Sequence, residues 1–192
     1  MPNHAGTENR RLAAIMFTDM VGYSALAQKN EALALELLEE HRRLLRSIFP
    51  KHQGDEVKTM GDGFLVEFAS ALAAVRCAIE IQDALARRNT MAPPDKFFQI
   101  RIGIHVGEVF IEEGEDSTKP KGFHGIQVDT CSRLMSLAKA NQILMTRSVF
   151  DNARQVLRGQ DLEGVGSLSW LNHGPYLLKG VEEPLEICEV GE

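Results

Sequence analysis

Two aspartates that stand beside glycines at the edges of apolar segments are the residues best suited to chemistry in this chain. Asp19 lies in FTDMVGYS (residues 17–24), and Asp62 lies in KTMGDGF (residues 58–64). Hard divalent ions bind carboxylate oxygens, and phosphoryl chemistry needs such ions held in position. Paired carboxylates at strand edges, next to a glycine-bearing turn that opens a helix, would therefore suit Mg²⁺ that holds a triphosphate.

Each aspartate also has a purely structural interpretation, so neither motif is decisive by itself. Asp19 could cap the helix that is expected after it, which is a common use of Asp. Asp62 could serve a tight turn between two strands, because Asp tolerates turn conformations. The backbone after Asp19 could also bind phosphate oxygens through N–H groups at the start of a helix, with a glycine that allows close approach. The residues of this backbone segment are Val21, Gly22, Tyr23 and Ser24.

Four further charged residues could complete such a site. Lys58, on the strand before Asp62, could reach a base or a phosphate, or it could simply be solvated. Asp129 and Arg133 lie four positions apart on one face of a predicted helix, where they could form an exposed ion pair. Alternatively, the permanent charge of Arg133 could neutralise a phosphoryl group. Lys179 is either a hairpin lysine or another phosphate ligand.

Hydrophobic periodicity predicts the elements that position these residues. The predicted strands are 12–18, 56–60, 63–68, 98–106, a partner strand that follows a turn at Gly107 and runs through Ile111, 142–146, 176–179 and 185–190. The predicted helices are a long one that carries Leu26 to Ile48, one capped by Ser70, one over 126–138 and one that starts near Ser148, with a loop over 112–123. This order predicts an α+β fold: a ferredoxin-like antiparallel sheet with helices packed on one face, plus C-terminal additions.

Composition fits one domain, because 192 residues with 44% hydrophobic content can fill one core. We expect residues 1–11 to be a polar linker and residues 12–192 to be the domain. The net charge of −6 argues against a nucleic-acid partner. The three cysteines form no Cys-x-x-Cys pair, which suits a reducing compartment. No stretch approaches the roughly 20 apolar residues of a membrane span, so we expect a cytoplasmic location and no membrane contact by this segment. A longer protein could add regulatory domains.

Taken together, the motifs resemble the catalytic domain of class III nucleotidyl cyclases, the adenylate and guanylate cyclases, of bacterial type. The resemblance runs from Leu12 to Val190 and has its motifs in the family's order: FTDMVGYS, KTMGDGF, RIGIHVG, VDTCSRL and the closing LKGVEEPLE. It implies a homodimer with active sites at the subunit interface. It also implies that Asp19, Asp62 and the carbonyl of Met20 hold two Mg²⁺ or Mn²⁺ ions per active site.

The resemblance further implies an adenylate cyclase that turns ATP into 3′,5′-cyclic AMP and pyrophosphate. In that reaction the ribose 3′-hydroxyl attacks the α-phosphate in line. Lys58 of the partner subunit would read adenine, and it favours ATP because guanylate cyclases usually carry Glu there. Arg133 of the partner subunit would stabilise the transition state, and Lys179 would hold the terminal phosphates.

Two positions depart from the family pattern. Gly122 falls where adenylate cyclases usually carry an Asp or Thr that reads the purine; Thr118 or a loop carbonyl could substitute. Asp129 falls where the family usually has an Asn that donates a hydrogen bond to the ribose, which an ionised Asp cannot do. The alternatives are therefore a degenerate domain that binds nucleotide for regulation or dimerisation, or a cyclase for GTP or a pyrimidine nucleotide. Diguanylate synthesis is disfavoured because its Gly-Gly-Asp/Glu-Glu-Phe signature does not occur.

The Asp129 departure gives a testable prediction. The substitution Asp129→Asn should raise catalytic activity or substrate affinity, because it restores a donor and removes a negative charge beside the triphosphate. Steady-state kinetics of the variant and the parent protein would measure both quantities. A variant that is no better than the parent would contradict this interpretation of Asp129.

Overall fold

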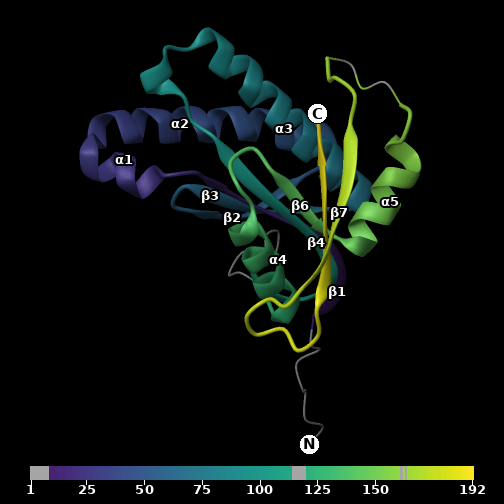
Figure 1. Cartoon of the computed structure of the whole chain (residues 1–192). Coiled ribbons are helices and arrows are strands. Elements are labelled where there is room, and N and C mark those ends of the chain that lie inside the picture. The colour runs from purple at the N-terminus through teal and green to yellow at the C-terminus, as the bar shows by residue number, and fades with distance from the viewer. Residues whose placement is uncertain (1–8, 114–119, 161, 163) are drawn as a thin grey trace, which may run out of the picture.

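A mixed β-sheet forms the centre of the computed structural model, which describes residues 9–113, 120–160, 162 and 164–192 (Figure 1). Within these residues, the eight strands are β1 (Arg10–Met20), β2 (Asp55–Met60), β3 (Gly63–Phe68), β4 (Ile100–Glu113), β5 (Pro120–His124), β6 (Ile143–Thr146), β7 (Ser169–Tyr176) and β8 (Leu185–Gly191). The helices are α1 (Tyr23–Lys29), α2 (Glu31–Ile48), α3 (Ala71–Met91), α4 (Ile126–Leu137) and α5 (Arg147–Leu157), with short 3₁₀ turns η1 (Phe49–His52) and η2 (Pro94–Lys96).

The strand order confirms the predicted α+β fold and its ferredoxin-like half. Strands pair in the order β2-β3-β1-β4-β6-β8-β7, and β5 pairs with the far end of β4. The pairs β2–β3, β3–β1 and β1–β4 are all antiparallel. The C-terminal additions make the sheet mixed, because β6 runs parallel to β4 after the α4 crossover.

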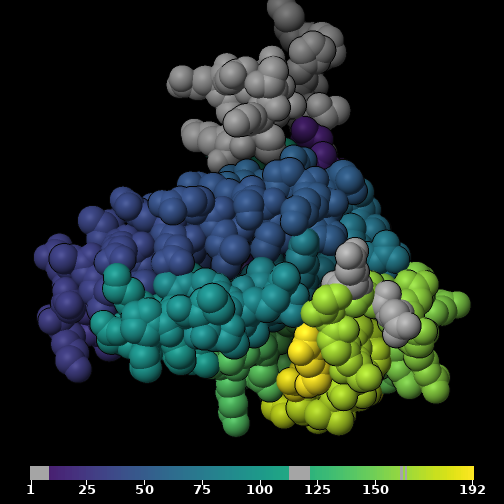
Figure 2. Space-filling view, turned by 90° about the horizontal axis from the view of Figure 1, so that it is seen from above, coloured from purple at the N-terminus to yellow at the C-terminus, as the bar shows by residue number. Residues whose placement is uncertain are grey.

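Helices cover both faces of the sheet. On one face, a larger core joins side chains such as Met16 and Ile102 to α2, α3 and α5. On the other face, a smaller core joins Ile15 of β1 to Cys131 and Met135 of α4. Figure 1 shows α2 and α3 above the sheet and α4 below it, and Figure 2 shows α2 (blue) and α3 (teal) as an extended layer seen from above. The expected packing on one face therefore holds for α2, α3 and α5, whereas α4 occupies the opposite face, where β1 is also apolar and where Gly103 and Gly107 of β4 leave room for the helix.

The long helix expected from Leu26 to Ile48 is two helices. The backbone of Asn30 leaves the helical region at φ −153°, and the Asn30 side chain accepts a hydrogen bond of 3.2 Å from the Leu33 N–H. Asn30 is therefore an N-cap that starts α2. The apolar periodicity continues through the break, which is why it indicated a single helix. Ser70 caps α3 as predicted, and its side chain accepts from the Ala73 N–H at 3.1 Å.

The turn expected at Gly107 is absent from the described strand β4, which runs through this position. Ala13 of β1 pairs with Gly107, so the long β1 holds β4 extended. The glycine serves a close approach instead, because a Cβ there would lie 2.5 Å from the Gln127 Cγ of α4. The loop expected over 112–123 holds β5, which forms a hairpin with β4, and residues 114–119 lie outside the described part of the chain.

The remaining expectations differ mainly at element ends. The strand expected over 176–179 is β7, which instead runs Ser169–Tyr176, so Lys179 follows it. β1 starts at Arg10, two residues before the expected start, while residues 1–8 of the expected linker lie outside the described residues. All three cysteines are free and buried. Among the helices of the described residues, none combines the length and the apolar character that a membrane crossing requires.

A buried histidine in the α2 layer makes the stability of the fold depend on pH. His41 is fully buried against Phe64 and Phe98, and neither of its ring nitrogens has a hydrogen-bond partner among the described residues. Burial, together with the nearby charges of Arg42 and Arg46, lowers the pKa of His41 from 6.5 to about 4. Between these two values the unfolded chain binds a proton that the folded chain excludes, so the free energy of unfolding falls as the pH falls through this window.

The substitution His41→Leu should remove this part of the pH dependence. Between about pH 7.5 and about pH 5, the parent protein should lose about 2 kcal/mol more stability than the variant, because only the parent excludes this proton. Urea denaturation at both pH values measures the difference, and His105, whose pKa burial also lowers, is present in both proteins. Equal losses in the two proteins would contradict the prediction.

Candidate active site

Strand pairing brings the two predicted acids together at one end of the sheet. Asp19 pairs with Gly63 across β1 and β3, and Asp62 occupies the adjoining β2–β3 turn. The Met20 N–H donates a 3.0 Å hydrogen bond to the Asp62 carbonyl, which fixes the turn against β1. Both aspartates are partly exposed. The structure thus brings the end of β1, which carries Asp19, beside the turn that carries Asp62.

Two glycines shape the turn that carries Asp62. Gly61 has φ +52°, a left-handed conformation that glycine adopts without strain. Gly63 is in extended backbone, but a Cβ there would lie 2.0 Å from the Thr18 carbonyl oxygen of β1. The first glycine therefore allows the chain to reverse, and the second allows β3 to approach β1 closely enough to set Asp62 beside Asp19.

The pair carries an electrostatic strain typical of a cation site. Burial raises the pKa of the Asp62 carboxyl, and the nearby charge of Asp19 raises it further. Asp19 is held by Arg101 of β4, whose Nε and Nη2 donate to Asp19 Oδ1 and Oδ2 at 2.7 and 2.9 Å. This bidentate hydrogen bond raises the pKa of Arg101. Two carboxylates at one edge of the sheet therefore share one protein cation.

Arg101 is a site residue that the sequence analysis missed. It belongs to the RIGIHVG motif, where the alternation of apolar and polar residues was used only to predict a strand. The signal that could have found it is register, because Asp19 and Arg101 are cross-strand partners in the β1–β4 pairing. Register between strands so far apart in the chain follows from tertiary packing rather than from a local pattern.

A second arginine supports the turn from the helix layer. Arg42 of α2 donates through Nη2 to the Gly61 carbonyl at 2.7 Å. One turn further along α2, Arg46 donates to both oxygens of Glu56 and to the Thr59 hydroxyl, all on β2. These contacts bind the β2–β3 hairpin to α2, so the position of Asp62 is fixed from the helix side as well as from β1.

The backbone after Asp19 provides fewer free donors than expected. The Val21 N–H donates to the Gln99 carbonyl at 2.8 Å and is therefore occupied. α1 begins at Tyr23 with Gly22 as its N-cap at φ +70°, and no side chain caps it. Asp19 is thus not the cap of this helix, which removes the structural alternative for this aspartate. The N–H groups left for a ligand are those of Gly22, Tyr23 and Ser24, because a helix leaves its first N–H groups unpaired.

The other predicted residues lie on the α4 face of the sheet. Side chains alternate along a strand, so Asp19 points to the same face as Ile15, which packs against α4. Lys58 pairs with Leu65 of that same core and is exposed, and β2, which carries it, lies beside β5. Arg133 is exposed on α4 itself. The α4 face, rather than the face covered by three helices, therefore carries the candidate chemistry.

Arg133 and the segment that contains Lys179 are neighbours. A Cβ on Gly180 would lie 3.8 Å from the Arg133 Nη2. Asp129, one turn before Arg133 and also exposed, lies in the first turn of α4, where a negative charge is favourable. Within the described residues, no ion pair joins Asp129 to Arg133, and no hydrogen bond joins either of them, Lys58 or Lys179 to the acid pair. The predicted residues thus form two separate groups on one chain.

Gly122 sits in β5, opposite Glu112 of β4, and is buried. The next polar side chain of this hairpin is His124, whose Nε2 lies 2.9 Å from a Glu112 carboxylate oxygen. Thr118, the suggested substitute for a purine-reading side chain, lies outside the described residues. Gly122 can therefore offer a ligand only its backbone, and β5, which carries it, lies next to β2, which carries Lys58.

The donor set at the acid pair fits a divalent ion that arrives with its substrate. Within the described residues, no cluster of three or more His, Cys, Asp or Glu side chains could hold a metal ion. The charge of Asp19 raises the pKa of Asp62, and Met20 can add only its carbonyl because its side chain is buried. Mg²⁺ is usually bound in this way, by one or two carboxylates plus substrate phosphates and water.

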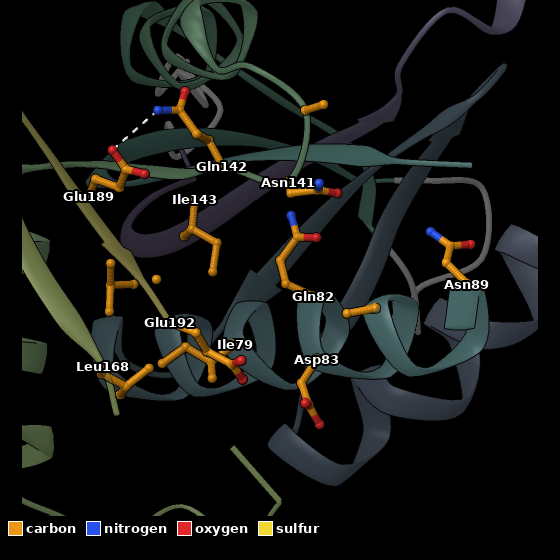
Figure 3. A pocket seen from close by; sticks show the side chains of 14 residues that line it. Ile79, Gln82, Asp83, Asn89, Asn141, Gln142, Ile143, Leu168, Glu189 and Glu192 are labelled. Carbon is orange, nitrogen blue, oxygen red and sulfur yellow. Dashed lines mark hydrogen bonds between the residues drawn. The ribbon is translucent and has the colours of Figure 1, made fainter. Parts of the chain in front are cut away.

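A hollow of about 400 Å³ lies elsewhere, between α3, the segment before β6 and the end of β8 (Figure 3). Its polar wall includes Gln82 of α3 and Gln142, whose Nε2 donates to Glu189 Oε2 at 3.1 Å. None of the residues predicted for chemistry lines it, and it belongs to the α3 side, whereas Asp19 faces α4. The hollow is therefore separate from the candidate site.

Comparisons with known proteins point to one family. The family described as "Adenylate and Guanylate cyclase catalytic domain" matches residues 7–181. A protein of Rhizobium meliloti (strain 1021) that bears the provisional name adenylate cyclase 3 is 31% identical over 179 residues, which are 93% of this chain and 28% of that protein. This chain therefore spans less than a third of that relative.

Solved structures agree in fold. An adenylate/guanylate cyclase/hydrolase from Silicibacter pomeroyi superposes with a TM-score of 0.76 at 28% identity and covers 96% of this chain and 98% of its own. The guanylyl cyclase Cya2 gives a TM-score of 0.76 at 26% identity and covers 95% of this chain and 93% of its own. The similar structures thus include names from both the adenylate and the guanylate side.

The close approach at Gly63 gives a stability prediction for the site. Gly63→Ala should destabilise the fold by about 3 kcal/mol or more, because the new methyl group meets a backbone oxygen that cannot move away. Gly61→Ala is the matched control: its Cβ would meet nothing within 4 Å, so it should cost only the left-handed strain of about 1 kcal/mol. Urea denaturation measures both, and similar losses for the two variants would contradict the close-approach explanation.

Proposed function

The chain belongs to the adenylate and guanylate cyclase catalytic domain family, and we propose that it is an adenylate cyclase that converts ATP to 3′,5′-cyclic AMP and pyrophosphate. The observation that carries the proposal is the acid pair at the sheet edge. Asp19 ends β1 opposite Gly63, Asp62 lies in the adjoining β2–β3 turn, and the charge of Asp19 raises the pKa of Asp62. Strand pairing and glycine contacts hold the two carboxylates together although their charges repel each other. Such a pair suits a cation-dependent reaction.

Asp19, Asp62 and the Met20 carbonyl would hold two Mg²⁺ or Mn²⁺ ions, which when bound supply activation of the 3′-hydroxyl and neutralisation of the leaving pyrophosphate. The residues of the chain have separate tasks. The free N–H groups of Gly22 to Ser24 would bind phosphate oxygens, with Val21 contributing position only. The β2–β3 turn, held by Arg42, keeps Asp62 facing Asp19 while the triphosphate is bound.

The second group of residues would act across a homodimer interface. Lys58, Arg133 and Lys179 are exposed on the described chain and make no hydrogen bond to the acid pair there. The α4 face is covered by a single helix, and α4 exposes Ile126 and Leu137, of which Ile126 is 71% exposed. Exposed apolar surface rimmed by polar residues marks interaction sites, and arginine is enriched at protein interfaces. A two-fold dimer through this face would give each active site its acids from one subunit and its cations from the other.

In that arrangement each cation has a chemical task. Arg133 would stabilise the charge that develops on the α-phosphate, for which a permanently charged guanidinium is well suited. Lys179, close to Arg133 through Gly180, would hold the terminal phosphates. Lys58 would read the adenine base, with backbone of the β5 hairpin near Gly122 replacing the missing purine-reading side chain.

Two observations favour a second candidate function. Gly122 has no side chain to select a base, and Asp129 has a structural task at the start of α4 that does not require catalysis. These support either a cyclase for GTP or a pyrimidine nucleotide, or a degenerate domain that binds nucleotide for regulation. The presence of Asp19, Asp62, Arg133 and Lys179 together favours an active cyclase, and Lys58 favours ATP as its substrate.

Product analysis would test the proposal. The purified chain, incubated with ATP, GTP, CTP or UTP and Mn²⁺, should give cyclic AMP as the main product. Asp19→Ala and Arg133→Ala should each lose activity by about a hundredfold or more. An absence of cyclic product from all four nucleotides would exclude the enzymatic function.

Mixing the two inactive variants tests the shared site. A dimer of one Asp19→Ala chain and one Arg133→Ala chain holds one active site with all its residues intact, so an equal mixture should regain about a quarter of the parent activity. A mixture that stays inactive, although the subunits exchange, would contradict the interface assignment. Each variant mixed with itself is the control.

A further inference from the structure

We propose that Arg101 acts as the resident counter-cation of the acid pair, so that a divalent ion binds Asp19 only by displacing the Arg101 guanidinium. This inference deepens the proposed function and rests on the part of it that assigns a metal to Asp19. It makes Arg101 a positioning residue that sets metal affinity and keeps the acid pair neutralised when no metal is bound.

The geometry of the contact is the first argument. Arg101 Nε lies 2.7 Å from Asp19 Oδ1, and Arg101 Nη2 lies 2.9 Å from Asp19 Oδ2. Both carboxylate oxygens therefore accept from the same planar guanidinium, which is the strongest arrangement that an arginine and a carboxylate form. A metal ion needs one or both of these oxygens. The arginine and the metal therefore compete for the same atoms.

The second argument is charge. Asp19 pairs with Gly63, the residue after Asp62, and the Met20 N–H donates to the Asp62 carbonyl, so both acids are held at one end of β1, where like charges repel each other. Among the described residues, Arg101 is the cation hydrogen-bonded to either carboxylate. Without it, the pair would carry two negative charges that only a bound ion could offset. Removal of Arg101 should therefore increase the affinity of the acid pair for a metal ion.

The third argument is that Arg101 has a second anchor. Its Nη1 donates to the Ser136 carbonyl at 3.1 Å, in the last turn of α4. The last carbonyls of a helix lack partners within the helix and favour positive charge. When Asp19 is given up to a metal, this carbonyl still pairs part of the guanidinium. The arginine can thus leave the carboxylate without becoming an unpaired, partly buried charge.

Metal binding in the absence of nucleotide tests the inference without any measurement of activity. Mn²⁺ titrations followed by the electron paramagnetic resonance signal of free Mn²⁺ give the dissociation constant for the whole chain. Arg101→Gln should bind Mn²⁺ about tenfold more tightly or better than the parent, because a charge-assisted bidentate contact no longer opposes the ion. Arg101→Lys, which keeps the charge but loses the planar fork, should fall between the two.

The matched control is Arg147→Gln, which removes an equal charge elsewhere. Arg147 lies on α5 and pairs with Asp151 and Glu186, on the side of the sheet opposite α4. Its loss should change Mn²⁺ affinity by less than about twofold, since exposed charges at a distance are screened by salt. Asp19→Asn identifies the site: in this background Mn²⁺ binding should be weak, and Arg101→Gln should no longer strengthen it.

Thermal unfolding gives an independent readout of the same competition. In excess chelator, Arg101→Gln should have a lower melting temperature than the parent, because two carboxylates face each other without a cation. Added Mn²⁺ should stabilise the variant more than it stabilises the parent, as linkage requires of tighter binding. Arg147→Gln should respond to Mn²⁺ as the parent does.

The outcomes separate this inference from the proposed function. Equal Mn²⁺ affinity in the parent and Arg101→Gln, or an equal gain in Arg147→Gln, overturns the counter-cation role while a metal site at Asp19 stands. Mn²⁺ binding that is unaffected by Asp19→Asn overturns the metal assignment and this inference with it. A chain that binds Mn²⁺ as expected but forms no cyclic nucleotide loses the proposed catalytic function and retains the Arg101 competition.

Discussion

The antiparallel pairing of β1 with β3 on one side and β4 on the other is the constraint on which the candidate site depends. It sets Asp19 opposite Gly63 and opposite Arg101 in the same register. The first pairing brings the turn that carries Asp62 close to Asp19. Burial and repulsion between the two carboxylates then raise the pKa of Asp62. The second pairing supplies the cation that offsets this repulsion. A slip of one residue in either register would turn Asp19 to the opposite face of the sheet, away from Arg101 and the turn that carries Asp62.

The unequal covering of the two sheet faces gives this edge its chemical environment. Three helices cover one face over a large apolar core. Only α4 covers the other face, and it lies close to β4 because a glycine at 103 leaves room: a Cβ there would lie 2.7 Å from the Met135 N. The outer surface of α4 therefore stays exposed beside the acids. The exposed cations and apolar side chains on this face are the physical basis for the proposal that a second subunit binds there.

Local patterns predicted most of the fold correctly, and the errors share a cause. Strong periodicity identified β3, the first half of β4 and the apolar stripe of α2, and Ser70 was recognised as the cap of α3. Two predictions were wrong, a single helix through Asn30 and a turn at Gly107, because the same residue types serve different purposes. Asn30 caps a helix within an unbroken apolar stripe, and Gly107 makes room for Gln127 rather than turning the chain. Local sequence cannot tell these purposes apart, since the deciding contact comes from another element.

The sequence by itself determined which residues could do chemistry, because carboxylates and guanidinium groups bring their charge to any fold. The order of its motifs determined which family it resembles. It placed Asp19 and Asp62 as candidates but left a helix cap and a turn residue open as alternatives. Only the tertiary structure excluded the cap, since Gly22 occupies that position. Only the tertiary structure showed that Arg101, 82 residues from Asp19 along the chain, neutralises it. Strand register decides that contact, and register is a property of the packed sheet rather than of any one strand.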